Sequence, residues 1–259
     1  MNMSPDSIPA LVLGMTAAAA TGLVGAFALM KRTILAGDVM SHIAIPGLGL
    51  AVLWRINPLV GGGLTLFAGI LLIWKLGQSG PLSTDASIGV LFAASVALGA
   101  LLIHSSEELV DALFGGLGAL SLASYIFGMA ASVFILVMMW RLRHELILAL
   151  FSSDLAAVSG VKVSRVNLWF LLLFGLAILS SLRYLGALLV GGLIIVPAAT
   201  ARQLTQTLGA FLASSALLAA AAMLAGFLLS ERYGLSLGPT VIMASAAGFA
   251  LSLLRPVSQ

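Results

Sequence analysis

The sequence predicts an all-α, polytopic membrane protein, a bundle of about nine transmembrane helices, with eight as the alternative count. The first observation behind this fold class is composition, because 61% of the 259 residues are hydrophobic and only 8% are charged, with a mean hydropathy of +1.17. Soluble domains carry about 25% charged residues. The second observation is the length of the uncharged stretches, since a helix needs about 20 apolar residues to cross a bilayer. No charged stretch is long enough to build a soluble domain, so we expect residues 1–259 to form a single transmembrane domain.

Charged residues mark the ends of the expected helices, because each costs about 2.5–3.5 kcal/mol at the centre of a membrane helix. The first expected helix, 8–30, carries no charge and ends at Lys31 and Arg32. The second, 39–54, is short and is interrupted by Asp38, His42 and Pro46, which is why eight helices is the alternative. The other seven expected helices are 56–74, 86–103, 124–140, 166–182, 184–201, a span within 203–230, and 233–254.

The distribution of Lys and Arg predicts the orientation in the membrane. One extended polar segment, 141–167, interrupts the apolar stretches, and we place it in the cytoplasm. With helices alternating outward from it, the far side receives three of the 12 Lys and Arg residues, Arg55, Arg183 and Arg232, and the cytoplasmic side receives the other nine. This bias follows the positive-inside rule and predicts an external N-terminus and a cytoplasmic C-terminus. The N-terminal residues MNMSPDSIPA lack the basic region and cleavage site of a signal peptide, so we expect the first helix to be retained.

Several kinds of chemistry are excluded by what the sequence lacks. There is no cysteine, hence no disulfide, thiol nucleophile or thiolate metal site. The HExxH, GxSxG and P-loop motifs are also absent, so we expect no enzyme activity and no ATP hydrolysis by the chain itself. An intramembrane enzyme is therefore disfavoured, and any energy source is expected to come from a partner. The net charge of +3 is too small and too dispersed to indicate nucleic-acid binding.

The segment 37–49, GDVMSHIAIPGLG, holds the candidate metal ligands Asp38 and His42. Four residues apart, they share one face of a helix at a distance of roughly 6 Å. A carboxylate and an imidazole are both ligands of divalent metals. Pro46 has no N–H to bond the His42 carbonyl, so we expect the helix to kink and leave that carbonyl available. Ionisable groups beside a broken helix at membrane depth indicate a functional site. The alternative is that Asp38 is a helix N-cap and His42 a packing residue.

A second polar cluster follows the expected helix 86–103 at its outer end. It comprises His104, Glu107, Glu108 and Asp111. These side chains either gather cations at an outer mouth or belong to a solvated loop, and the sequence leaves both interpretations open.

Two ligands do not complete a metal coordination shell, so further ligands to a metal at Asp38 and His42 must come from elsewhere in the assembly.

Three segments together resemble the zinc, manganese and iron ABC transporter permeases. The first, GDVMSHIAIPGLGLA at 37–51, resembles that family's Gly-Asp-x-x-Ser/Ala-His signature. In the second, SSDLAAVSGVKVSRVN, Asp154, Ala156 and Gly160 match the family's Asp-x-Ala-x-x-x-Gly pattern. The third is GALLVGGLIIVPAATAR, followed by GLSLGPTVIMASA. The order and spacing match over nearly the whole chain, and the departures, at 43–45 and at Ser159, leave the two proposed ligands unchanged.

The resemblance implies the metal permease fold and a function as the permease subunit of an ATP-driven importer. The transported ion would be Zn²⁺, with Mn²⁺ or Fe²⁺ next, and no cofactor would be bound permanently. The family's metal-binding Asp and His map onto Asp38 and His42. The implied partners are a second copy of the chain, two cytoplasmic ATP-binding subunits and a periplasmic or lipid-anchored metal-binding protein, at a bacterial cytoplasmic membrane. A cytoplasmic coupling segment at about 141–165 would contact the ATP-binding subunits through about 150–165.

Two other transport functions fit the membrane assignment. One is a proton-coupled secondary metal transporter, which would need no ATP-binding partner. The other is an ABC permease for a chelated metal, such as a siderophore, or for vitamin B12. Permeases of that kind are usually longer, and the pair Asp38 and His42 favours a bare ion.

Overall fold

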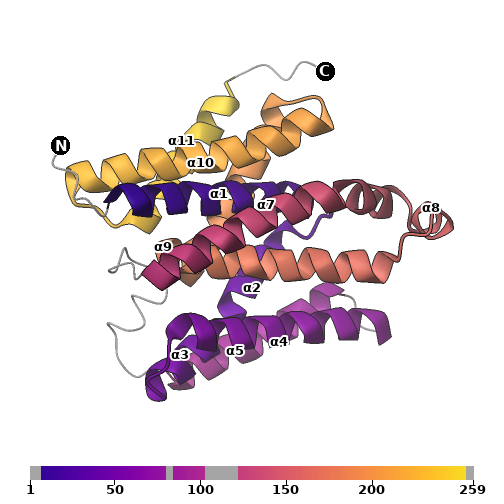
Figure 1. Ribbon diagram of the computed structural model, residues 1–259, viewed down its shortest axis with the longest axis horizontal. Coiled ribbons are helices and arrows are strands. Elements are labelled where there is room, and N and C mark those ends of the chain that lie inside the picture. Colours follow the sequence, from indigo (N-terminus) through magenta and orange to yellow (C-terminus); the bar gives the residue numbers. More distant parts are fainter. Residues whose placement is uncertain (1–6, 80–83, 103–121, 255–259) are drawn as a thin grey trace.

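The computed structural model describes residues 7–79, 84–102 and 122–254, and every regular element within these ranges is a helix (Figure 1). The helices are α1 (Ser7–Met30), α2 (Ile34–Ile43), α3 (Ile45–Leu53), α4 (Pro58–Ser79), α5 (Thr84–Leu102), α7 (Leu122–Phe151), α8 (Ser153–Val158), α9 (Val163–Leu204), α10 (Leu208–Tyr233) and α11 (Leu237–Ser252).

Five apolar segments of these helices are long enough to cross a membrane: Ile8–Met30, Pro58–Gly77, Leu122–Phe151, Val163–Leu182 and Leu208–Tyr233. Four shorter apolar segments are Val39–Leu53, Ala86–Leu102, Leu189–Leu204 and Leu237–Ser252. In the described part of the chain, these nine segments follow the nine predicted helices in order. The predicted all-α multi-pass class is therefore confirmed.

Helix α1 lies inside the bundle, with α7, α9 and α10 packed against it (Figure 1). Its side chains Val24 and Phe27 are fully buried. Helices α3, α4 and α5 pack on one another and form a second group, at the bottom of the view in Figure 1. Helix α2 connects the two groups, because it contacts α9 as well as α4 and α5. The helix that carries the candidate ligands therefore lies between the two groups.

Helix α9 folds back on itself and supplies two of the predicted spans. Its 42 residues would extend about 63 Å if straight, about twice the hydrocarbon thickness of a bilayer. A Cβ built on Gly37 of α2 would lie 2.7 Å from Phe174 Cζ and 3.0 Å from Ile194 Cδ1. Twenty residues of straight helix would separate those two side chains by about 30 Å. The chain therefore reverses direction between Phe174 and Ile194, as expected from the separate predictions of 166–182 and 184–201.

The polar segment 141–167 is more helical than its composition indicates. Helix α7 does not end where the charges begin but continues from Arg141 to Phe151, because Arg, Leu, Glu and Ala are good helix formers in water as well as in lipid. Ser152 then adopts an extended conformation, and its hydroxyl accepts a hydrogen bond of 3.2 Å from the Leu155 N–H, which caps α8. Gly160, with φ of +80°, turns the chain towards the start of α9.

Glycine allows close approach of helix backbones at several crossings. A Cβ on Gly47 of α3 would collide with the Gly61 carbonyl oxygen of α4, and a Cβ on Gly61 would collide with the Gly47 carbonyl oxygen. Between α1 and α10, the Ser215 hydroxyl donates to the Gly22 carbonyl at 2.6 Å. Small residues and hydroxyl hydrogen bonds are the expected means of holding helices together in lipid, where burial from water contributes little.

Replacing Gly47 with alanine should therefore destabilise the protein by about 1–3 kcal/mol, because the added methyl group meets backbone that cannot rotate away. Thermal unfolding of the detergent-solubilised chain measures this effect. Gly248→Ala is the matched control, since a Cβ there meets nothing within 4 Å, and helix propensity then favours alanine by about 1 kcal/mol. Equal melting temperatures for the two variants would contradict the packing at the α3–α4 crossing.

Candidate functional site

Both predicted ligands lie in α2, which begins at Ile34 after the N-cap residue Thr33. Asp38 is the fifth residue of this helix, so the interpretation of Asp38 as an N-cap is wrong. His42 follows one turn later, and at about 100° per residue the two positions share one face of α2. The Asp38 side chain itself lies outside the described part of the structure. The opposite face carries Ala36 and Met40, both buried in the core.

The His42 side chain is half-buried and faces α5. Its imidazole meets the Phe92 ring edge to face, with ring centroids 5.3 Å apart and an interplanar angle of 77°. Such aromatic contacts have a preferred geometry and restrict the orientation of the ring. Because Phe92 belongs to α5 and Met40 packs behind α2, His42 lies at the junction between α2 and the α3–α4–α5 group. The imidazole is therefore partly covered by α5 and is not fully exposed.

The helix break predicted at Pro46 is confirmed. Helix α2 ends at Ile43, and α3 begins at Ile45 with Pro46 in its first turn. Ala44 between them caps α2, its N–H donating to the Ser41 carbonyl at 3.3 Å, and a backbone N–H at the break donates to the His42 carbonyl. The His42 carbonyl therefore has a backbone partner at the break, and the expectation that it is left available is wrong. The structural reason is that the chain closes the break with a tight cap instead of an open kink.

The structure assigns no third ligand beside Asp38 and His42 among the described side chains, which do not include that of Asp38. Within those ranges, no group of three or more His, Cys, Asp or Glu residues is placed to hold a metal ion. The cluster of His104, Glu107 and Glu108, with Asp111, lies in 103–121, outside the described residues. That further ligands come from elsewhere in the assembly stays a prediction.

A polar contact joins the end of α1 to the start of α9. The Lys31 Nζ donates a hydrogen bond of 2.5 Å to Asn167 Oδ1 and lies 4.7 Å from the centroid of the Phe170 ring. Nearby, the Trp74 indole N–H donates to the Ser164 carbonyl at 3.1 Å. A cavity of about 210 Å³ lies between these contacts and the packed face of α2. The first turns of α9 are thus tied both to the α1–α2 connection and to the end of α4.

The buried amine of Lys31 makes the stability of the folded chain dependent on pH. The residue follows α1 outside the spanning segment, and burial lowers the pKa of its amine from 10.5 to about 8. The unfolded chain therefore binds more protons than the folded chain between about pH 8 and pH 10.5, and stability rises with pH across that window. Relative to Lys31→Met, the wild-type melting temperature should increase from about pH 7 to about pH 10. Lys75→Met, at an exposed position, should show no such trend; a pH-independent difference for Lys31→Met would contradict the burial of the amine.

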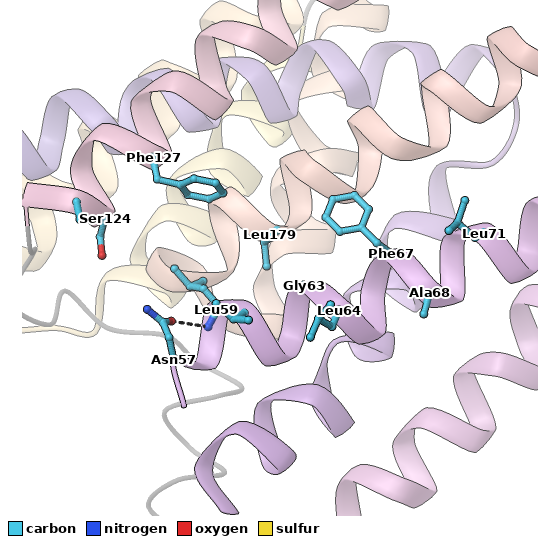
Figure 2. Close-up of a pocket in the computed structure, with 12 residues that line it drawn as sticks. Asn57, Leu59, Gly63, Leu64, Phe67, Ala68, Leu71, Ser124, Phe127 and Leu179 are labelled. Atoms are coloured by element: carbon cyan, nitrogen blue, oxygen red, sulfur yellow. Dashed lines mark hydrogen bonds between the residues drawn. The ribbon is translucent and has the colours of Figure 1, made fainter. Parts of the chain in front are cut away.

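A cavity of about 610 Å³ is an apolar groove away from α2 (Figure 2). It lies between α4 and α7, with Phe67 and Phe127 on its two sides and Leu179 between them (Figure 2). Asn57 at one end is the main polar side chain, and its Oδ1 accepts a hydrogen bond of 2.9 Å from the Leu59 N–H. No ionisable side chain lines this groove among the described residues, so it offers no charged ligand to a cation.

Two features of the site were not found from the sequence. Phe92 had no local signal, because an aromatic residue in an apolar span is usually a packing residue, and only the crossing of α2 and α5 places it against His42. The sequence marks Lys31 as the charge that ends a helix. It marks Asn167 only as part of a segment that resembles a permease family. A lysine immediately after an uncharged helix is a signal for an interfacial contact, but its partner is 136 residues away.

The comparisons with known proteins agree with this architecture. Residues 5–255 match the family model described as the ABC 3 transport family. The high-affinity zinc uptake system membrane protein ZnuB of Haemophilus influenzae is 29% identical over 252 residues, covering 95% of this chain and 96% of the relative. The manganese transport system membrane protein MntC of Halalkalibacterium halodurans is 28% identical over 235 residues, covering 89% of this chain and 80% of the relative.

A solved structure has the same fold. A chain of PsaBC from Streptococcus pneumoniae in complex with Fab superposes with a TM-score of 0.82 at 24% sequence identity, covering 94% of this chain and 89% of that one. The family model extends over nearly the entire sequence, including α2 with Asp38 and His42 and the segment around α8. The chain is therefore a member of the ABC 3 transport family.

Proposed function

We propose that this protein is the membrane-spanning permease subunit of an ATP-driven importer of a divalent transition-metal ion. Zinc is the first candidate, with manganese or iron next. The observation that carries the proposal is the position of Asp38 and His42 on one face of α2, beside a helix break and between the two groups of helices, in a chain of the ABC 3 transport family. Carboxylate and imidazole ligands suit all three metals. An incomplete site suits transport, because an ion must leave as readily as it enters.

The metal assignment is supported by the names of the relatives, which are a zinc uptake and a manganese transport protein. The similarity extends over most of each relative, so it includes the region of the proposed ligands. Oxygen and nitrogen ligands without thiolate do not separate zinc from manganese. We place zinc first because a site with given nitrogen and oxygen ligands generally binds zinc more tightly than manganese or iron.

Helix α8 is the proposed contact for a cytoplasmic ATP-binding subunit. Ala156 is fully buried and anchors α8 to the bundle, whereas Leu155 is 60% exposed and Val158 is 89% exposed. Phe151, at the end of α7, is 85% exposed. An exposed apolar cluster in a segment outside the spanning helices is typical of a protein-docking surface. This surface falls within the segment 150–165 that the sequence predicts to meet the ATP-binding subunit.

The contacts of α9 offer a route from α8 to the proposed metal site. Helix α9 begins at Val163, shortly after α8 ends at Val158. Its first turns bond Lys31 through Asn167, and Lys31 lies just before α2. A displacement of α8 would therefore act on α2 through few intermediate residues, with the adjacent cavity of about 210 Å³ providing space behind the helix. The energy for this movement would come from ATP binding and hydrolysis in the partner, since the chain has no P-loop motif.

We further propose that the importer lies in the bacterial cytoplasmic membrane, with the N-terminus outside and the C-terminus inside. The excess of Lys and Arg on the side of 141–167 supports this orientation. The end of α1, α8 and the start of α9 lie at one end of the bundle (Figure 1), which would be the cytoplasmic end. The complete importer would contain two copies of the permease, two ATP-binding subunits and a metal-binding protein that delivers the ion.

Reconstitution tests the proposed function. The tagged chain is purified from its native membrane, co-purified subunits are identified by mass spectrometry, and the complex is placed in liposomes with its metal-binding protein. Uptake of radioactive zinc, manganese and iron is then measured with and without ATP. We expect ATP-dependent uptake of one or more of these ions. Uptake driven by a proton gradient without ATP, or ATP-dependent uptake of only a chelated metal, would contradict the proposal.

A further inference from the structure

A second groove, distinct from the proposed metal site, lies where α7 and α10 both pack against α1. Its volume is about 420 Å³. Leu23 of α1 forms the floor, Leu136 and Val137 of α7 line one wall, and Leu212 and Ala216 of α10 line the other. This lining is apolar along its length, and the volume is in the range of small-ligand pockets. The groove is open to the surface of the bundle, where Val137 is 47% exposed, so an acyl chain can enter it from the bilayer.

One end of this α7–α10 groove is positively charged. Arg141 lines the groove beside Trp140, and the Arg143 guanidinium lies 3.8 Å from the centroid of the Trp140 ring. Arg143 Nε also donates to His144 Nε2 at 3.2 Å. Glu145 follows Arg141 by one helical turn, but neither arginine forms a salt bridge with an acidic side chain in the part of the chain that the structure describes.

The neighbouring helix adds no negative charge at this end. The first turn of α10 contains no acidic residue, and its cap residue Thr207 accepts a hydrogen bond from the Ala210 N–H. The remaining N–H groups of that turn present the positive end of the helix dipole. Arg202, in the last turn of α9, is exposed and carries a further positive charge in the preceding segment. The apolar groove therefore ends in a region where positive charge predominates.

The depth of the charged end corresponds to the level of lipid phosphates. The apolar part of α7 ends at Trp140, and Arg141 is the first charge after it. Tryptophan concentrates at the membrane–water interface. Guanidinium groups bind phosphate oxygens through paired hydrogen bonds and are less strongly hydrated than ammonium groups. The combination of an apolar groove with two guanidinium groups at its interfacial end matches both parts of a phospholipid.

We propose that the α7–α10 groove binds an anionic phospholipid, with one acyl chain between α7 and α10 and the phosphodiester at Arg141 and Arg143. The lipid stabilises the packing of α7 and α10 on α1. The site is independent of metal transport, because it shares no residue with α2. A lipid whose headgroup carries a net negative charge is preferred over a zwitterionic one, since choline would place an ammonium group against the two guanidinium groups.

Native mass spectrometry of the full chain tests the proposal, with delipidated protein titrated by phosphatidylglycerol or phosphatidylcholine of the same acyl chains. Each arginine near an anionic lipid contributes about a fivefold factor in affinity, so we expect a preference for phosphatidylglycerol of about 30-fold.

The double variant Arg141→Gln/Arg143→Gln should bind the two lipids almost equally. The control Lys162→Gln/Arg165→Gln, with two exposed cations next to α8, should keep the wild-type preference. Ala213→Phe, at an exposed position of the groove wall, should weaken the binding of both lipids.

Several outcomes would overturn the proposal. Equal binding of the two lipids by the wild type, or an unchanged preference in the double variant, would remove the role of the arginines. Inorganic phosphate that raised the melting temperature as much as phosphatidylglycerol would show that the groove holds no acyl chain. The chain has no native cysteine, so Ala213→Cys provides a single labelling site. Efficient disulfide cross-linking of two copies through this cysteine in membranes would assign the groove to a protein interface instead.

Discussion

His42→Ala should reduce ATP-dependent zinc uptake by the reconstituted importer at least about 100-fold, because losing even a residue that supports a metal ligand costs 10–100-fold in metal affinity or activity. The imidazole is half-buried against Phe92, and alanine supplies no ligand atom in its place. Asp38→Asn should have an effect of similar size, since the amide retains the shape of the carboxylate without its charge. Initial rates of radioactive metal uptake over a range of metal concentrations measure both effects.

The control for this prediction is His144→Ala, because His144 is exposed on α7, far along the chain from α2. It should transport at the wild-type rate. Assembly must be checked for every variant by co-purification of the ATP-binding subunit, and ATP hydrolysis should persist in His42→Ala even when uptake is lost. Normal metal uptake by an assembled His42→Ala variant would refute the proposed site while leaving the family assignment intact.

The double variant Leu155→Glu/Val158→Glu should abolish binding of the ATP-binding subunit and with it ATP-dependent uptake. Burying each of these side chains at an interface contributes about 1.5–3 kcal/mol, so losing both corresponds to roughly a 100-fold or larger loss of affinity. The two side chains are 60% and 89% exposed in the isolated chain, so their replacement leaves the fold unchanged. Co-purification from membranes and ATP hydrolysis by the complex measure the expected loss.

Ser159→Glu is the matched control for the α8 variant, because it adds negative charge next to Val158 at an exposed polar position. It should retain the ATP-binding subunit. If the Leu155/Val158 variant also kept its partner and its uptake, the docking surface would have to lie elsewhere on the cytoplasmic end. Loss of the partner in both variants would indicate sensitivity to charge instead of a specific apolar contact.

Sequence reasoning was most successful for the membrane-spanning helices. Each span must be apolar over its own length, because lipid surrounds it in every fold that it could join. The expected helix 8–30 accordingly corresponds to α1, and the two spans expected within 166–201 appear as the two limbs of α9. Boundaries in water were predicted less well, since α7 extends ten residues beyond Arg141 to Phe151 and charge alone does not end a helix.

The candidate site was predictable as a local motif but not as a place in space. The spacing of Asp38 and His42 and the break at Pro46 follow from helix geometry and from proline chemistry. The tight cap at the break, where a backbone N–H engages the His42 carbonyl, depends on how the chain closes the break and was not foreseen. The remaining ligands of a metal were not assigned from the sequence, and the cluster that includes His104 lies outside the described residues.

The sequence by itself determined the membrane environment, the order of the apolar helices and the residue types available for cation binding, because these are properties of short segments and of the solvent they require. Only the tertiary structure decided that Phe92 faces His42, that Lys31 reaches Asn167, and that α3 and α4 cross at Gly47 and Gly61. Each of these contacts joins residues that are far apart in the chain, and each depends on helix rotation and crossing. In lipid, those are set by the fit of small side chains and a few interhelical hydrogen bonds, which no segment specifies alone.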